Sequence, residues 1–374
     1  MKHFIYMLGI TLCLQGKAQE GLVLKGSVKD DHGAALPGAT VFLNGTKWVT
    51  ACDTVGWFIL AKVKPGDYKL IVKAVGFKAL VKDVVLRDQD LQLSLQLEPD
   101  AKYLKAVTVK PDAGWLRNVE LFKQQFLGES DNAMQCKLVN PGVLNFTYDK
   151  HTDNLSATAD DLLVIRNPQL GYELKYVLDH FVYNSTRGAV IYDGFPSFRE
   201  LHGTREEETQ WKVNRQTAYL GSIHHFIHAV YDQNSKAEGF LVYKLRNRLP
   251  YGFPGSAGIG TPKLDYNPVS FDSLLIVTDD RHKLLQFSDE LYIVYTKGKE
   301  PSRFTDERFS LGGAFTTRAM PPGQVSIVTG FGPVTIDESG GFRPTPSLYF
   351  EGYMGWEKIG DLVPFDYDPT ADQP

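Results

Sequence analysis

Leu91-Gln92-Leu93-Ser94-Leu95-Gln96-Leu97 alternates apolar and polar side chains without interruption. Residues 68–74 repeat the pattern, with Tyr68, Leu70, Val72 and Ala74 on one side. A period of two predicts a β-strand that buries one face and exposes the other. These two stretches therefore predict a sheet with one packed face.

Turn-forming pairs divide residues 21–98 into short segments. Asn44-Gly45 is a strong hairpin-turn pair, and Pro65-Gly66 sets another turn. About seven short strands at spacings of roughly 8–12 residues are typical of an antiparallel sandwich of the immunoglobulin or transthyretin type. We therefore expect an N-terminal all-β domain over residues 21–98.

The turn and strand residues of this region also carry a family resemblance. The matching positions are Gly26-Ser27-Val28, Asp30, Leu36-Pro37-Gly38-Ala39-Thr40-Val41, Thr50, Asp53, Gly56, Phe58, Val63, Pro65-Gly66-Asp67-Tyr68-Lys69-Leu70 and Val75-Gly76-Phe77. The region resembles the carboxypeptidase regulatory-like domain, a transthyretin-like sandwich of many Gram-negative envelope proteins. Peptidase activity belongs to a separate zinc domain of some relatives, which needs a His followed three residues later by a Glu. None of the nine histidines has that spacing, so carboxypeptidase activity is not expected.

The same module precedes many TonB-dependent outer-membrane transporters, in which a short strand at the position of residues 105–109 contacts TonB. About 265 residues follow position 109, too few for a plug and a barrel of about 22 strands at about 10 residues each. We therefore interpret residues 105–109 as a linking strand within a linker of residues 99–111.

The first residues follow the pattern of a targeting segment. Lys2 and His3 precede an apolar run over residues 4–14, and the small residues Gly16 and Ala18 follow. This order is typical of a secretory signal peptide, expected here over residues 1–18. No later apolar stretch reaches the roughly 20 residues of a membrane-spanning helix. We therefore expect an exported protein, in the periplasm or associated with the outer membrane, without a transmembrane segment in the mature chain.

Charge and cysteine content further limit the classes of protein to which the chain can belong. The formal net charge is −4 and no long basic run is present, which argues against binding nucleic acid. Removal of residues 1–18 leaves Cys52 and Cys136. An exported chain can form a disulfide, but a disulfide-built scaffold uses more cysteines. A Cys52–Cys136 bridge stays open as an alternative, and we expect two buried free thiols.

Residues 112–374 predict a second, strand-rich α+β domain. One helix is expected from Asp112 to Gly128 and a longer one over about residues 205–232, where apolar residues recur every three or four positions. Pro250–Pro268 is a Gly/Pro-rich loop. Strands are expected at residues 143–148, 162–166, 172–183, 189–192, 240–245, 274–277, 291–295, 324–329 and 347–350.

Four segments of this second part carry another resemblance. They resemble a group of uncharacterised exported proteins that carry the sandwich in front, and they are residues 135–141, Leu170-Gly171-Tyr172, residues 215–226 and Gly352-Tyr353-Met354-Gly355-Trp356. That resemblance implies no activity.

Several short patterns come close to known sites without completing them. His224 and His228 have the spacing of a zinc helix, but His225 stands where the catalytic Glu belongs and no third ligand is evident. Residues 255–260 lack the order of a phosphate-binding loop, and Ser256 lacks the preceding Gly of a nucleophile elbow. Asp160-Asp161 and Asp279-Asp280 are adjacent pairs that suit solvated turns better than a glycosidase dyad.

The C-terminal region is rich in aromatic residues, which suit either core packing or a platform for sugar rings. They are Tyr349, Phe350, Tyr353, Trp356, Phe365 and Tyr367. Asp53-Thr54-Val55 and Asp272-Ser273-Leu274 resemble a short bacterial O-glycosylation pattern.

No complete catalytic set emerges, so no catalytic, cofactor-binding or metal-binding residue is predicted, and no cofactor. We favour a non-enzymatic cell-envelope protein whose sandwich docks or spaces a domain that binds an outer-membrane protein, a surface protein or a glycan. The alternative is an exported hydrolase with an active site assembled from distant positions, using His225 with a carboxylate.

Overall fold

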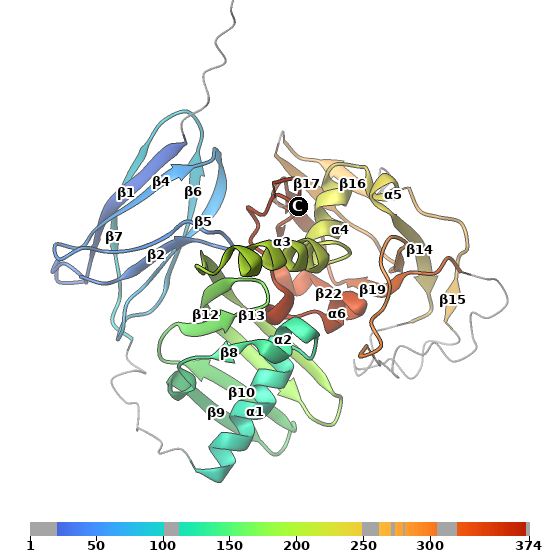
Figure 1. The fold of residues 1–374 in the computed structure, drawn as a ribbon, viewed down its shortest axis with the longest axis horizontal. Helices are drawn as coiled ribbons and strands as arrows, with labels where there is room; N and C mark the ends of the chain where they lie inside the picture. Colours follow the sequence, from blue (N-terminus) through green and yellow to red (C-terminus); the bar gives the residue numbers. More distant parts are fainter. Residues whose placement is uncertain are drawn as a thin grey trace, which may run out of the picture.

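The structure is a computed structural model that describes residues 21–100, 112–248, 262–270, 274–279, 281–304 and 320–371 (Figure 1). The expected signal peptide at 1–18, the linking strand at 105–109, the loop segment 255–260 and Asp280 lie outside the described residues.

The N-terminal part is the expected strand-only sandwich. One sheet has the order β4-β1-β7 and the other β3-β2-β5-β6. The strands are β1 (Leu22–Lys29), β2 (Thr40–Leu43), β3 (Val49–Ala51), β4 (Trp57–Val63), β5 (Gly66–Lys73), β6 (Leu80–Leu86) and β7 (Leu91–Gln96). Leu24, Leu70 and Leu95 belong to the core between the sheets. All neighbours are antiparallel except β1 and β7, which pair in parallel from Leu24 opposite Leu91.

The sandwich packs directly on the rest of the chain. Phe42 and Ile71 form an apolar cluster with Leu162 and Val177 of the second domain. The predicted turn at Gly45 lies in this contact: its N–H donates to the Pro196 carbonyl at 2.7 Å, and its carbonyl accepts from the Phe365 N–H at 2.7 Å. A Cβ at Gly45 would come within 2.2 Å of the Phe365 ring, so this close approach requires glycine.

A six-stranded antiparallel sheet begins the second domain. Its order is β8-β11-β12-β10-β9, with β13 also paired to β12. The strands are β8 (Lys137–Leu138), β9 (Leu144–Asp149), β10 (Asn154–Ala159), β11 (Leu163–Asn167), β12 (Tyr172–Asn184) and β13 (Ala189–Glu200). Helix α1 (Ala113–Leu127) packs Phe122 and Phe126 against this sheet. The Asp112 carboxylate caps it and it ends before Gly128, as predicted.

Two further sheets complete the domain. One has the order β15-β14-β18-β19-β22 and the other β16-β17-β20-β21. Their strands are β14 (Phe240–Arg246), β15 (Lys263–Leu264), β16 (Leu275–Val277), β17 (His282–Leu285), β18 (Glu290–Tyr295), β19 (Gln324–Gly330), β20 (Val334–Asp337), β21 (Phe342–Arg343) and β22 (Leu348–Gly352). The prediction of a strand-rich α+β domain is confirmed. Strand β13 extends eight residues beyond the predicted 189–192, because its second half stays paired with β12.

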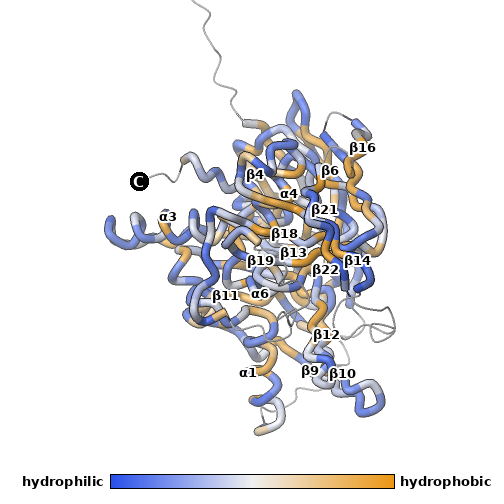
Figure 2. The backbone as a smooth tube through the Cα atoms, turned by 90° about the vertical axis from the view of Figure 1, so that its right-hand side faces the viewer, coloured by the Kyte–Doolittle hydropathy of each residue, from blue (hydrophilic) through white to orange (hydrophobic). Residues whose placement is uncertain are grey.

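The prediction of one helix over 205–232 is wrong. The structure has α3 (Arg205–Tyr219) and α4 (Ile223–Tyr231), separated at Gly221, whose φ of 87° is left-handed. The Ser222 hydroxyl accepts from the His225 N–H and starts α4 as a new helix. Because the apolar spacing continues across the break, the hydrophobic periodicity of the sequence does not reveal it. In Figure 2 α3 is mostly hydrophilic, whereas the strands at the centre of the molecule are hydrophobic.

Two further expectations concern cysteines and membrane spans. Cys52 and Cys136 are both free and buried, as predicted. Burial raises the pKa of Cys52 to about 11 and that of Cys136 to about 12, so both stay as unreactive thiols. Among the helices of the described ranges, none has the length and apolar character needed to cross a bilayer.

Candidate functional site

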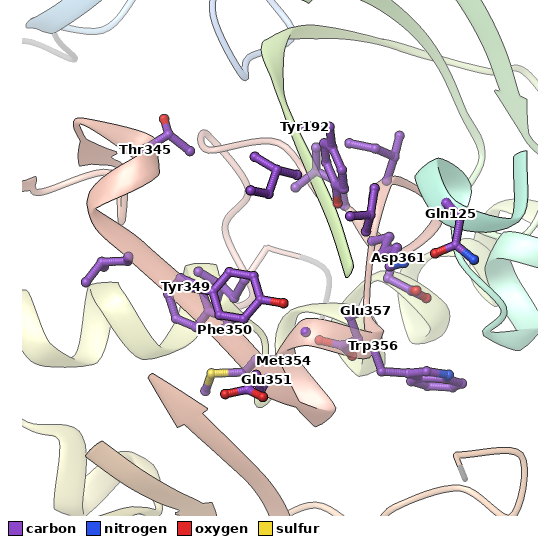
Figure 3. Close-up of a pocket in the computed structure, with 18 of the residues that line it drawn as sticks. Gln125, Tyr192, Thr345, Tyr349, Phe350, Glu351, Met354, Trp356, Glu357 and Asp361 are labelled. Atoms are coloured by element: carbon purple, nitrogen blue, oxygen red, sulfur yellow. The ribbon is translucent and has the colours of Figure 1, made fainter. Parts of the chain in front are cut away.

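A cavity of about 1020 Å³ opens within the second domain. One wall is formed by β13 and the end of α1, and another by β22 and the chain that follows it. That chain contains α6 (Tyr353–Trp356) and the short 3-10 helix η7 (Ile359–Asp361). Figure 3 shows Glu357, Asp361 and Trp356 in the same part of the cavity as Gln125, with Thr345 on the opposite side.

Aromatic side chains from both sides line the cavity. Tyr349, Phe350, Trp356 and Phe365 come from the aromatic-rich C-terminal region, and Tyr192 faces them from β13. The other two predicted aromatics have different places. Tyr353 is buried beside Trp356, with ring centroids 5.7 Å apart, and Tyr367 packs on Tyr219. Four of the six aromatics are therefore brought together at the cavity.

The most unusual polar feature is a pair of carboxyl groups, Glu357 and Asp361. Burial raises the pKa of Glu357 well above its ordinary value, the negative charge of Asp361 adds to this, and a hydrogen bond with the Tyr353 hydroxyl opposes it. Burial also raises the pKa of Asp361. Within the described part of the chain, Glu357 Oε2 and Asp361 Oδ2 have no hydrogen-bond partner. Both groups are thus held in the neutral, protonated form over a wider pH range than usual.

Local structure fixes the position of Asp361. Its Oδ1 accepts from the Ser130 hydroxyl at 2.8 Å and from the Asn132 amide at 2.9 Å, both at the start of α2 (Asp131–Gln135). The neighbouring Gly360 lies so close to Ala133 that a Cβ would come within 2.4 Å of the Ala133 Cα. The carboxyl group is therefore held by a rigid contact that leaves its second oxygen unused.

A second pair of carboxylates lies nearby, and it is fully paired. Arg248 donates from Nη1 to Glu290 at 3.0 and 3.1 Å, and it contacts Glu351 at 2.8 Å from Nη1 and 3.0 Å from Nη2. The Thr329 hydroxyl donates to Glu290 at 2.6 Å. Burial raises the pKa of Glu290, while the bonds from Thr329 and Arg248 lower it. Glu351 lines the cavity as well.

The histidines of α4 make different contacts from one another. His224 lines the cavity, and its Nε2 donates to the Ser339 carbonyl at 2.6 Å. Its Nδ1 is then an acceptor, and it has no partner among the described residues. His228 Nδ1 meets the Tyr219 hydroxyl at 3.1 Å. Burial lowers the pKa of His224 to about 4, so the ring is neutral at ordinary pH.

His225, the residue of the hydrolase alternative, does not line the cavity. Its Nδ1 accepts from the Gly221 N–H at 3.0 Å, and its Nε2 lies 3.4 Å from Glu238. Burial lowers its pKa to about 4. With both ring nitrogens engaged, His225 has no site left for activating a nucleophile, and the hydrolase alternative gains no support from it.

The adjacent acidic residues that the sequence singled out accept hydrogen bonds from nearby groups where the structure describes them. Asp160 accepts from the Asn145 amide at 2.9 Å, and Asp161 accepts from the N–H of Leu162 at 2.7 Å. Asp279 accepts from the N–H groups of Arg281 and His282. Ser256 lies outside the described residues. Thr54 is exposed, in a turn held by Asp53. Within the described ranges no cluster of three or more His, Cys, Asp or Glu side chains is placed to hold a metal.

The sequence did not predict that four groups belong to one site, namely Glu357, Asp361, Tyr192 and the Nδ1 of His224. The only local signal is the spacing of two acidic residues, four apart, directly after an aromatic run. That pattern is common in solvated segments, so it does not identify a buried pair by itself.

Comparison with known proteins identifies the N-terminal module. The CarboxypepD_reg-like domain family model matches residues 24–109, which confirms the resemblance of the sandwich region. No family model covers the C-terminal part. No curated protein matches the chain.

Solved structures give only distant similarities. The 3-chlorocatechol 1,2-dioxygenase of Rhodococcus opacus 1CP is 11% identical with a TM-score of 0.18, over 22% of this chain and 62% of that one. A type II cohesin–X–dockerin complex of Acetivibrio cellulolyticus is 18% identical (TM-score 0.20; 29% and 76% covered). A putative carbohydrate binding protein of Bacteroides uniformis ATCC 8492 is 12% identical (TM-score 0.19; 42% and 58% covered). The chain thus spans less than two thirds of the first and third of these proteins, and TM-scores this low carry no argument about function.

Proposed function

We propose that the protein is an exported, non-enzymatic binding protein of the cell envelope, and that its cavity holds a glycan. The observation that carries the proposal is a cavity of about 1020 Å³ whose wall combines aromatic rings with unused hydrogen-bond acceptors. Pockets of this kind, mostly apolar with a few fixed polar groups, are typical of small-molecule binding sites.

The chemistry of the wall suits sugar rings. The C–H faces of a sugar pack on aromatic rings, here Trp356, Tyr349 and Tyr192. Its hydroxyl groups need acceptors inside the cavity, and His224 Nδ1 is one that the fold leaves unused. Export is supported by the order of residues 1–18, which follows that of a secretory signal peptide.

The sandwich is then a docking or spacing module for a protein partner at the outer membrane or cell surface. Its direct packing on the second domain, through the cluster around Phe42 and Val177, holds the binding domain in a fixed orientation. Such rigid coupling is what a module that presents a ligand-binding domain to a partner requires.

The test is calorimetric titration of the purified chain without its first 18 residues against a panel of oligosaccharides. Binding of at least one glycan is expected, with affinity falling about tenfold or more in Trp356→Ala, since an aromatic contact contributes on the order of 1 kcal/mol beyond its buried area. Trp115→Ala is the matched control, because Trp115 is also half-buried but packs on β9 outside the cavity.

Two results would contradict the proposal. One is a panel in which no glycan binds, or in which Trp115→Ala weakens binding as much as Trp356→Ala. The other is cleavage of the bound glycan, detected by chromatography of the reaction mixture. Cleavage would show that the protein is an enzyme.

A further inference from the structure

The carboxyl groups at one end of the cavity indicate which glycan it takes. We propose that the ligand carries a free amino group, as in a glycan with unacetylated amino sugars, and that Glu357 and Asp361 bind it as an ammonium ion. This inference rests on the proposed glycan function and adds to it the chemical class of the ligand.

The first support is geometric. Asp361 is 7% exposed, and its Oδ1 is fixed by Ser130 and Asn132, so Oδ2 is the only oxygen left for a ligand. Glu357 Oε2 is the second unpartnered oxygen, and both residues line the same cavity (Figure 3). An ammonium group has three donors and no acceptor, which matches two carboxylate oxygens that both lack a donor.

The second support is the excess of acidic over basic side chains on the wall. Six carboxyl side chains line the cavity, against three from Lys or Arg, among the residues that the structure describes. The carboxyl groups are those of Glu129, Asp179, Asp193, Glu351, Glu357 and Asp361, and the basic side chains are Arg187, Arg303 and Lys358. Arg303 is already paired with Asp131 at 3.0 Å. The groups that shift the pKa of Glu357 are Asp361 and Tyr353, and neither is basic.

The third support is aromatic. Trp356, the last residue of α6, directly precedes Glu357 and lines the cavity, and its ring packs on those of Tyr353 and Phe304, with centroids 5.7 and 5.6 Å away. Tyr192 is labelled on the same side of the cavity as Asp361 in Figure 3. Aromatic faces attract cations, and a site that combines them with carboxylates is suited to an ammonium group.

His224 also lines the cavity, and its Nδ1 is a buried, neutral acceptor without a partner among the described residues. It is suited to a hydroxyl of the same ligand. A neutral sugar offers only hydroxyl donors to these acceptors, whereas an amino sugar also brings a positive charge to the carboxyl pair, so the two ligand classes are distinguishable.

The proton balance follows from the protonated state of the pair. In the empty cavity a carboxyl keeps its proton, because burial and the neighbouring acid disfavour its charge. When the ligand enters as R–NH₃⁺, the carboxyl gives its proton to the buffer and pairs with the ammonium group, which stays protonated. Binding of an amino ligand therefore releases a proton, and binding of a neutral sugar does not.

Three matched probes test the inference: the β-1,4-linked trisaccharides of glucosamine, N-acetylglucosamine and glucose, which differ only in the substituent at one carbon. Each is titrated by calorimetry at mildly acid pH in two buffers of different ionisation enthalpy, which gives the protons released per complex. We expect the glucosamine trisaccharide to bind at least tenfold tighter than the other two, and to be the only one that releases protons.

Glu357→Gln keeps the shape of the side chain and removes its charge. It is expected to abolish the tenfold preference and to reduce the proton release, since Asp361 remains. Glu129→Gln is the matched control, since Glu129 lines the same cavity but is exposed, and it is expected to keep the preference. The proton count of the unmodified chain is a measurement that does not depend on how either variant folds.

The outcomes separate the two proposals. Equal binding of all three trisaccharides, or preference without proton release, overturns the amino-group inference and leaves the glycan function standing. A preference that survives Glu357→Gln also overturns the inference. Binding of none of the three overturns the amino-group inference, and the glycan function is contradicted as well if the wider panel also fails to bind.

Discussion

Two pairs of carboxyl groups lie in the second domain, each with one buried member (Glu290, Asp361) and one half-buried member (Glu351, Glu357), and the fold treats them differently. Glu290 and Glu351 share the guanidinium group of Arg248, and Thr329 adds a further hydrogen bond. Glu357 and Asp361 have no basic partner among the groups that shift the pKa of Glu357, and each keeps one oxygen unpaired. A buried carboxylate that serves the fold needs a donor within the protein, because an unpaired buried charge is costly. The unpaired pair is therefore the one that a ligand can complete.

The largest expected effect comes from breaking the paired site. Arg248→Met removes the only cation held between Glu290 and Glu351 in the described residues and leaves both carboxylates uncompensated. Removal of one partner from such a buried network costs about 3–5 kcal/mol of unfolding free energy. Urea-induced unfolding measures it, and a loss below about 1 kcal/mol would show that the two pairs do not differ in this way.

The opposite sign is expected at the unpaired site. Glu357→Gln removes a group that opposes folding when ionised, so it should stabilise the protein at neutral pH by on the order of 1 kcal/mol. The sign depends on pH. Glu357 has a raised pKa in the folded state, so its contribution is fully present below its ordinary pKa of 4.5 and is lost as the pH rises through the folded value.

The gain from Glu357→Gln should therefore disappear at a pH below about 4, where the carboxyl is protonated in both states. Thermal unfolding at several pH values measures the difference between the two chains. A variant that is less stable than the unmodified chain at neutral pH would indicate that the hydrogen bond with the Tyr353 hydroxyl outweighs the cost of the charge, and that Glu357 belongs with the paired acids.

A loss smaller than that of Arg248→Met is expected at Thr329. Thr329→Val keeps the shape and removes the hydroxyl that donates to Glu290, while both bonds from Arg248 remain. We expect a loss of about 1.5–3 kcal/mol in unfolding free energy, as for a single hydrogen bond to a charged group. A loss as large as that of Arg248→Met would mean that Thr329, and not the guanidinium group, is the main support of Glu290.

The sequence predicted what depends on local pattern. The alternation over 91–97 and the turn at Asn44-Gly45 were sufficient for the sandwich, and Asp112 and Gly128 marked both ends of α1. The break at Gly221 was missed because the apolar spacing of α3 continues into α4. The parallel pairing of β1 with β7 was missed because the pairing of strands distant in sequence is not encoded in either strand alone.

The candidate site was predicted only in part. The aromatic-rich C-terminal region was recognised as a platform or a core, and four of its members line the cavity. The carboxyl pair was not recognised, because its burial depends on contacts between distant segments. Asp361 is fixed by Ser130, which lies 231 positions earlier in the chain. No periodicity or motif carries that information.

The most direct test is a crystal structure of the protein with the β-1,4-linked glucosamine trisaccharide bound. We expect the trisaccharide in the cavity beside Trp356, with one amino nitrogen within hydrogen-bond distance of both Glu357 Oε2 and Asp361 Oδ2. A trisaccharide bound elsewhere on the protein, or in the cavity with its amino groups turned away from both carboxyl groups, would contradict this assignment.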